Sequence, residues 1–152
     1  MNSFIMIIYD SATIRKPAEM TLQRAGYSGM SFADSESALQ WLDEHLEMRP
    51  ALVLLDVQLP GIDGYTWAMH VKSKLRFQMT TTVLMSAEPV SREKMRAAGI
   101  TAYIEKPSTV QKLLATVQTQ MQAHALLEKS ATRMLFIQKP PLSRSCLSAV
   151  FN

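Results

Sequence analysis

The chain has 152 residues, of which 47% are hydrophobic and 19% are charged, and its formal net charge is +3. This length and composition favour one compact folded domain and exclude an intrinsically disordered protein. The small net charge gives no indication of direct nucleic-acid binding, and the single cysteine, Cys146, excludes an internal disulfide. Because the apolar run from Phe4 to Ile8 is too short to span a membrane, we expect a cytoplasmic protein with no membrane attachment.

Short apolar runs of strand length alternate with longer amphipathic segments along the chain. The runs are Phe4–Tyr9, Gly29–Phe32, Ala51–Leu55, Thr82–Ser86 and Ala102–Ile104. The third run shows no alternation of apolar and polar residues, which is typical of a parallel strand buried on both faces. Strands and helices that alternate in this way predict an α/β fold with a parallel sheet and right-handed crossovers.

Polar residues that can cap helices precede three of the amphipathic segments; they are Asp34 or Ser35, Ser91, and Ser108. The first expected helix contains Pro17, whose missing N–H costs about 3 kcal/mol at an interior helical position. A helix that begins at Thr13 or later would place Pro17 in its first turns and reduce this cost.

Four polar residues fall at or just after the ends of predicted strands. Asp10 follows the first strand and Asp56 the third, while Ser86 ends the fourth and Lys106 follows the fifth. Each residue alone has an ordinary explanation as a turn, cap or loop residue. Sites in open α/β sheets form outside the carboxyl ends of the strands, so four such residues at one edge predict a functional site.

The residue types at this edge suit phosphoryl transfer to a carboxylate. Asp56 is the candidate nucleophile, because an aspartate side chain can form an acyl phosphate. Asp10, Asp56 and nearby backbone carbonyls can hold Mg²⁺, which prefers oxygen ligands and keeps several waters. Lys106 can place positive charge against the phosphoryl oxygens, and the Ser86 hydroxyl can donate a hydrogen bond to them.

These residues lie in four motifs that occur in order along the chain. The motifs are Tyr9-Asp10-Ser11-Ala12-Thr13-Ile14-Arg15-Lys16, Leu54-Leu55-Asp56-Val57-Gln58-Leu59-Pro60-Gly61-Ile62-Asp63-Gly64, Leu84-Met85-Ser86-Ala87-Glu88 and Tyr103-Ile104-Glu105-Lys106-Pro107. Together they resemble the receiver domain of two-component signalling, over residues 4–117. The first motif resembles the start of chemotaxis and twitching-motility receivers, and the second matches the family's phosphoacceptor loop.

The resemblance implies a single-domain response regulator with a flavodoxin-like, doubly wound (βα)5 fold. This fold is a three-layer α/β sandwich with a parallel sheet in the order 2-1-3-4-5, here followed by an extended C-terminal helical tail. The resemblance also implies that a histidine kinase or phosphotransfer partner phosphorylates Asp56, and that phosphorylation changes the binding of a downstream protein partner. Such a protein catalyses only its own phosphorylation and dephosphorylation, so we do not expect an enzyme.

Carried over position by position, the resemblance implies a role for each site residue. Asp56 is the phosphoacceptor, Asp10 is a direct Mg²⁺ ligand, and the backbone carbonyl of Gln58 is a further ligand. Lys106 pairs with the phosphoryl group, and Ser86 supplies the switch hydroxyl.

Tyr103 has two interpretations. In the family's switch, the position of an aromatic ring follows that of the hydroxyl residue, which makes Ser86 and Tyr103 the face that changes partner binding. An ordinary half-buried strand tyrosine explains the same residue nearly as well, and the sequence leaves both open.

One position departs from the family pattern. Receivers usually carry two acidic residues at the end of the first strand, and here the first of them is Tyr9. The loss of one carboxylate predicts weak Mg²⁺ binding and slow phosphorylation. A degenerate receiver that acts as a phosphorylation-independent protein-interaction module is the alternative, although Asp10, Asp56, Ser86 and Lys106 all remain.

Two other classes of protein fit less well. Aspartyl-phosphate hydrolases typically carry a second aspartate two residues after the nucleophile, where this chain has Gln58. A flavodoxin-type flavin site needs a loop that cradles phosphate, and the loop Ser11–Arg15 contains no glycine.

The helical pattern continues beyond the usual end of the family's last helix. We therefore divide the chain into a receiver domain, residues 1–122, and a helical and basic C-terminal extension, residues 123–152. A helix over Thr109–Gln138 would be about 45 Å long. Its positions at heptad spacing, which predict a possible homodimer through this helix, are Val110, Leu113, Val117, Gln120, His124, Leu127, Ala131 and Met134.

Polar residues interrupt this series at Gln120 and His124, so two helices with a break near His124 are nearly as plausible as one extended helix. We expect His124 on a solvated helix face and any helix to end at Pro140-Pro141. The segment is too short for a separate output domain. It is either a docking or self-association tail or a segment without function.

Overall fold

A computed structural model of the chain describes residues 4–100, 102–106 and 109–151, with the side chains of the last helix as far as residue 130. Its elements are β1 (Ile5–Ile8), α1 (Ala12–Arg24), β2 (Gly29–Phe32), α2 (Ser35–Glu44), β3 (Leu52–Asp56), α3 (Gly64–Lys72), a short 3-10 helix η1 (Leu75–Phe77), β4 (Thr81–Ser86), α4 (Arg92–Ala97), β5 (Ala102–Glu105) and α5 (Val110–Phe151). All strand pairs are parallel, in the order β2-β1-β3-β4-β5, which confirms the predicted topology.

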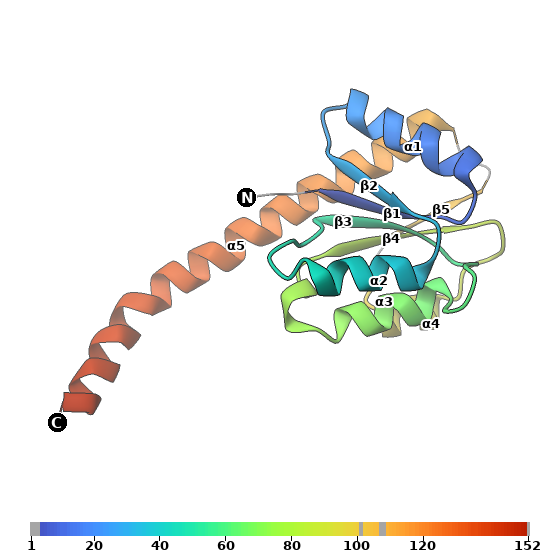
Figure 1. Cartoon of the computed structure of the whole chain (residues 1–152). Coiled ribbons are helices and arrows are strands. Elements are labelled where there is room, and N and C mark those ends of the chain that lie inside the picture. The colour runs from blue at the N-terminus through green and yellow to red at the C-terminus, as the bar shows by residue number, and fades with distance from the viewer. Residues whose placement is uncertain (1–3, 101, 107–108, 152) are drawn as a thin grey trace.

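Helices cover both faces of the sheet, so the fold has the three predicted layers. Figure 1 shows α1 and α5 on one face and α2, α3 and α4 on the other. Alternate residues of each central strand point to opposite faces. In β1, Met6 and Ile8 join the core under α2 to α4, whereas Ile5 and Ile7 join the core under α1 and α5. This explains why the central strands read as unbroken apolar runs.

The expected caps are present where the structure describes them. The Asp34 carboxylate accepts a hydrogen bond from the Ser37 N–H at 2.7 Å, and this bond lowers the pKa of Asp34. Ser91 caps α4 in the same way, by accepting from the Lys94 N–H at 3.2 Å. Ser108 lies outside the described residues, and the hydroxyl of Thr109 accepts from the Lys112 N–H at the start of α5.

The first helix begins earlier than the start at Thr13 or later that would reduce the cost of Pro17. It starts at Ala12, one residue before Thr13, so Pro17 is its sixth residue and lies in the second turn. Leu22 and Ala18 of this helix are buried against the sheet. Packing of this apolar face stabilises the helix and outweighs the hydrogen bond that Pro17 cannot donate.

One continuous helix, α5, follows β5, so of the two alternatives the structure has the single extended helix and not two helices with a break near His124. Leu113, Val117 and His124 are buried, with exposed fractions of 9%, 0% and 5%. Leu113 and Val117 belong to the core cluster on the sheet of the same chain, and His124 lies on the same stripe of the helix. The expectation that His124 faces solvent is therefore wrong, because it lies two helical turns after Val117 on this buried stripe.

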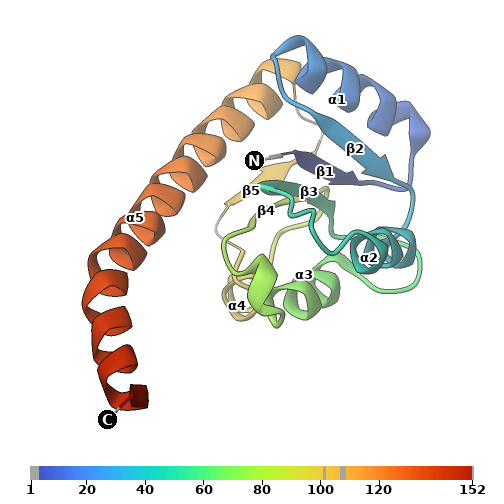
Figure 2. The same cartoon turned by 60° about the vertical axis from the view of Figure 1, so that its left-hand side comes forward.

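This stripe changes the dimer hypothesis. Leu113, Val117 and His124 of the heptad series are buried inside the domain and are not available to a second copy, whereas Val110 is 58% exposed. Leu126 and Leu127 are exposed where the helix leaves the domain, and Figure 2 shows the helix running on beyond the sheet.

The helix also continues through Pro140-Pro141, so its predicted end there is wrong. The fixed φ of proline is compatible with a helix even though its N–H is missing. Among the helices that the structure describes, none is long and apolar enough to cross a membrane.

Candidate functional site

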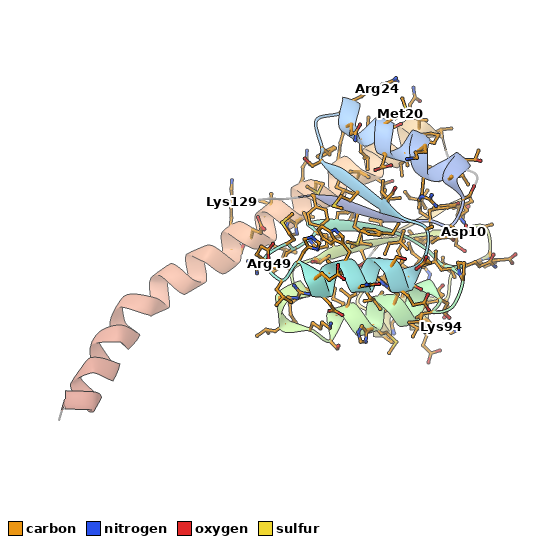
Figure 3. The ribbon with its side chains drawn as sticks, viewed as in Figure 1. Asp10, Met20, Arg24, Arg49, Lys94 and Lys129 are labelled. Atoms are coloured by element: carbon orange, nitrogen blue, oxygen red, sulfur yellow. The ribbon has the colours of Figure 1, made fainter. Side chains whose placement is uncertain are left out.

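The carboxyl ends of β1, β3, β4 and β5 bring the four predicted site residues to one edge of the sheet. Asp56 and Ser86 are the last residues of β3 and β4, and Lys106 directly follows β5. Asp10 lies on the loop from β1 to α1 and is exposed at this edge, as Figure 3 shows. The topology that the apolar runs predict therefore collects these residues at the expected place.

Asp56 is a buried carboxylate with a cation beside it. The residue is 3% exposed, and its Oδ1 accepts a hydrogen bond from the Lys106 ammonium at 2.8 Å. The same oxygen accepts a hydrogen bond from the Gln58 N–H at 3.2 Å. Oδ2 has no hydrogen-bond partner among the described residues, so one oxygen is fixed and the other is open to a phosphorus atom or a metal ion.

Both the backbone and the side-chain ammonium of Lys106 make contacts at this edge. Its backbone N–H donates to the Ser86 carbonyl at 2.8 Å, and its ammonium lies 4.3 Å from the centre of the Tyr9 ring. Burial alone would lower the pKa of Lys106, but the hydrogen bonds and charges of Asp56 and Tyr9 outweigh it and raise the pKa above its ordinary value. The lysine therefore stays charged beside the carboxylate.

Arg15 is a residue of this edge that the sequence analysis did not single out. Its guanidinium donates hydrogen bonds to the backbone carbonyls of Tyr9, at 2.8 Å, and Asp10, at 3.0 Å. These bonds fix the loop that carries Asp10. Arg15 stands in the first motif, one turn into α1, and an arginine at that spacing from a strand end is the signal that could have identified it.

Ser86 and Tyr103 occupy neighbouring strands next to this edge. The Ser86 hydroxyl donates to the Glu88 carbonyl at 2.7 Å and accepts from the Glu88 N–H at 3.1 Å. The hydroxyl is thus engaged by the loop between β4 and α4. Tyr103 is paired in register with Leu84 of β4, and 37% of the tyrosine is exposed.

The donor set at this edge suits a hard cation. The carboxylates of Asp10 and Asp56 and the backbone carbonyl of Gln58 are of the oxygen type that such a cation prefers. Within the described residues, no group of three or more His, Cys, Asp or Glu could hold a metal. Because Mg²⁺ is usually held by one or two carboxylates together with waters, the residues present fit Mg²⁺.

A cavity of about 540 Å³ lies between α1 and α5, next to this site. Its walls are mostly apolar, and Tyr9 and Lys106 border it. The Tyr9 ring is buried, whereas 24% of the Lys106 side chain is exposed to solvent.

The family model of the response regulator receiver domain matches residues 5–118. The chain belongs to this family. Receiver domains are signalling proteins rather than classical enzymes, and they generally bind Mg²⁺ at an acidic pocket. In this receiver domain, Tyr9 leaves that pocket with one carboxylate fewer than the family usually has.

Individual relatives agree with this assignment. The receiver is 28% identical to protein PilG of Pseudomonas aeruginosa over 120 residues, which are 77% of this chain and 86% of PilG. It is 28% identical to the polar-differentiation response regulator DivK of Brucella ovis over 80% of this chain and 98% of DivK. Among solved structures, chemotaxis protein CheY4 of Vibrio cholerae is similar, with a TM-score of 0.69, 26% identity, and coverage of 78% of this chain and 98% of CheY4.

Proposed function

We propose that this receiver domain accepts a phosphoryl group on Asp56 from a histidine kinase or a phosphotransfer protein. The pair between the Lys106 ammonium and the Asp56 carboxylate, at 2.8 Å, is the observation that carries the proposal. A buried carboxylate with a fixed cation at the carboxyl edge of a parallel sheet suits a nucleophile that must meet an anionic phosphoryl group.

In this reaction, the bond from phosphorus to the donor's imidazole nitrogen breaks as a bond forms to Oδ2 of Asp56. The imidazole leaves and takes up a proton from water. Lys106 remains close to Oδ1 and places its positive charge against the phosphoryl oxygens, and the raised pKa of Lys106 keeps that charge in place. The Gln58 N–H holds the carboxylate in orientation during the attack.

Asp10, Asp56 and the backbone carbonyl of Gln58 are the residues that would hold Mg²⁺. When bound, Mg²⁺ supplies positive charge against which two anionic groups can approach each other. Because Tyr9 replaces a carboxylate, we expect this site to bind Mg²⁺ weakly.

We further propose that phosphorylation changes partner binding through the face around Ser86 and Tyr103. A phosphoryl group on Asp56 is a stronger hydrogen-bond acceptor than the Glu88 carbonyl that now holds the Ser86 hydroxyl. Transfer of this hydrogen bond releases the loop between β4 and α4. The exposed Tyr103 ring then has a different neighbour, and a downstream protein partner binds one of the two arrangements more tightly.

The test is the intact mass of the chain after incubation with a small-molecule phosphodonor, with and without Mg²⁺. We expect a gain of one phosphoryl group in the native chain and none in Asp56→Asn. Asp43→Asn is the matched control, because Asp43 is an exposed carboxylate of α2 that pairs with Lys74 away from this edge. A gain that persists in Asp56→Asn would contradict the proposal.

A phosphorylation-independent interaction module is the second candidate, and Tyr9 is the observation that favours it. The chain would then use the same fold without a working metal pocket. No phosphoryl gain at high Mg²⁺, together with unchanged partner binding by Asp56→Asn, would support this candidate instead.

The division of the chain into a receiver domain, residues 1–122, and an extension, residues 123–152, is also part of the proposal. The basic residues and exposed Leu126 and Leu127 of the extension support a role in docking or self-association. If the chain forms a homodimer through α5, the contact lies beyond the buried stripe that ends at His124.

A further inference from the structure

Tyr9 occupies the position beside the proposed phosphoacceptor. The register of β1 and β3 pairs Ile8 with Leu55, so the next residues along the two strands, Tyr9 and Asp56, stand side by side. Tyr9 is 4% exposed and belongs to the core cluster under α1 and α5. A buried ring therefore lies where the family usually has a carboxylate.

The backbone of Tyr9 is fixed on both sides. Its N–H donates to the Phe32 carbonyl at 3.1 Å, and its carbonyl accepts from the Arg15 guanidinium at 2.8 Å. The side chain packs in the core and borders the apolar cavity between α1 and α5. These contacts hold the ring in one place.

Lys106 lies between this ring and the carboxylate. Its ammonium is 2.8 Å from Oδ1 of Asp56 and 4.3 Å from the centre of the Tyr9 ring. An ammonium over an aromatic face is attracted by the negative face of the ring, and the attraction is stronger where water is excluded. The ring thus restrains Lys106 without placing a further carboxylate in the pocket.

A carboxylate at position 9 would act differently. It would attract Lys106 away from Asp56, and it would also contribute to a metal pocket. The ring face attracts the lysine only. The replacement therefore leaves Lys106 paired with Asp56 and removes part of the attraction for a divalent cation.

We propose that Tyr9 is a positioning residue that holds Lys106 on Asp56, so that the lysine supplies positive charge that a bound cation otherwise supplies. This inference rests on the proposed role of Asp56 as the phosphoacceptor. It predicts that phosphorylation of the native chain depends less on the Mg²⁺ concentration than phosphorylation of a chain with an acid at position 9.

The first experiment observes the Lys106 ammonium by NMR in the full chain without metal. We expect a restrained Lys106 signal in the native chain and in Tyr9→Phe, which keeps the ring, and its loss in Tyr9→Leu. Tyr27→Leu is the matched control, because Tyr27 packs against the same core cluster. A Lys106 signal in Tyr9→Leu that is unchanged from the native chain would overturn the proposal.

The second experiment measures Mg²⁺ binding by calorimetry and phosphorylation across Mg²⁺ concentrations. We expect Tyr9→Asp to bind Mg²⁺ at least ten-fold more tightly than the native chain and to lose more of its phosphorylation rate when Mg²⁺ is withdrawn. Equal Mg²⁺ affinity, or equal Mg²⁺ dependence of the rate, in the two chains would overturn the proposal.

Circular dichroism checks that each variant is folded. If Tyr9→Leu does not fold, Tyr9→Met, which fills the space without a ring, replaces it, and Tyr9→Asp is still decisive. If no chain, native included, accepts a phosphoryl group, the proposed function fails. The Lys106 signal and the Mg²⁺ affinity of the unphosphorylated chains then decide the role of Tyr9 separately.

Discussion

The Ser86 hydroxyl is bound twice by one residue of the next loop: it donates to the Glu88 carbonyl at 2.7 Å and accepts from the Glu88 N–H at 3.1 Å. Ser86 ends β4 at the functional edge, and Glu88 is the second residue of the connection to α4. The hydroxyl therefore links the carboxyl edge of the sheet to the loop above it. Any new acceptor for this hydroxyl must displace Glu88.

Replacement of Ser86 by alanine should loosen this loop. The variant loses both hydrogen bonds to Glu88, and we expect the free energy of unfolding to fall by about 1 kcal/mol. Urea unfolding measures the change, and amide exchange at Glu88 should become faster. Ser86→Thr keeps a hydroxyl and serves as the control. Amide exchange in Ser86→Ala that matches the native chain would contradict the prediction.

Removal of the Lys106 ammonium should leave a buried charge without a partner. We expect Lys106→Met to lower the free energy of unfolding by about 2 kcal/mol, less than for a fully buried pair because the lysine side chain is 24% exposed. The double variant Asp56→Asn/Lys106→Met removes both charges and should recover most of this loss. If the single and double variants unfold at the same denaturant concentration, the explanation is wrong.

The same pair predicts a pH dependence at the alkaline end. The pKa of Lys106 in the folded chain lies above its ordinary value of 10.5, because the hydrogen bond and charge of Asp56 and the contribution of Tyr9 outweigh burial. The stabilisation is therefore fully present below about pH 10.5 and is lost as the pH rises through the raised pKa. The stability difference between the native chain and Lys106→Met should disappear above that pKa, as urea unfolding across pH would measure.

Gly64 gives the phosphoacceptor loop its close packing. A Cβ at this position would collide with the backbone oxygen of Asp56 and lie 3.0 Å from the Cα of Val57. We expect Gly64→Ala to lower the free energy of unfolding by about 1–3 kcal/mol and to displace the Asp56 backbone. Gly29→Ala is the control, because the nearest atom to a Cβ there is the Ile5 oxygen at 3.8 Å. Equal thermal midpoints for the two variants would contradict this prediction.

Shortening α5 should show which part of the helix stabilises the domain and which part is needed for self-association. A chain that ends at Ser130 keeps Leu113, Val117 and His124, so we expect an unfolding midpoint close to that of the full chain. A chain that ends at Gln122 loses the buried His124 and should be less stable by about 1 kcal/mol. Sedimentation of the full chain and of the chain ending at Ser130 then tests self-association. A dimer that survives the shorter ending would place the contact elsewhere.

The sequence predicts the sheet well because its signals are local and strong. The unbroken apolar run from Leu52 to Leu55 is typical of a strand buried on both faces, and parallel connectivity brings Asp56, Ser86 and Lys106 to one edge. The contact of Lys106 with Tyr9 and the contact of Arg15 with two loop carbonyls depend on how side chains fill space between elements. The position of Arg15 one turn into α1 could have indicated its contact, whereas no spacing in the sequence indicates the contact between Lys106 and Tyr9.

The burial of His124 in the last helix is a second feature that the sequence did not predict. Polar His124 suggests a solvated face, but the phase of α5 is set by Leu113 and Val117 on the sheet, and His124 follows them in register. Its Nε2 lies 3.1 Å from Glu128 Oε1, within the same helix. Its Nδ1 is buried without a hydrogen-bond partner among the described residues, so the packing of Leu113 and Val117 rather than full hydrogen bonding accounts for the burial of His124.

The unbroken path of α5 also has a mechanical consequence. A helix of 42 residues is about 63 Å long, and its first turns lie directly after Lys106 and the functional edge. Because α5 is buried as far as His124, a tilt of about 5° there would move its end, about 40 Å further on, by about 3.5 Å, by the geometry of a rigid rod. A small change in how the buried part of α5 packs would therefore be enlarged along the part of the helix that extends beyond the domain.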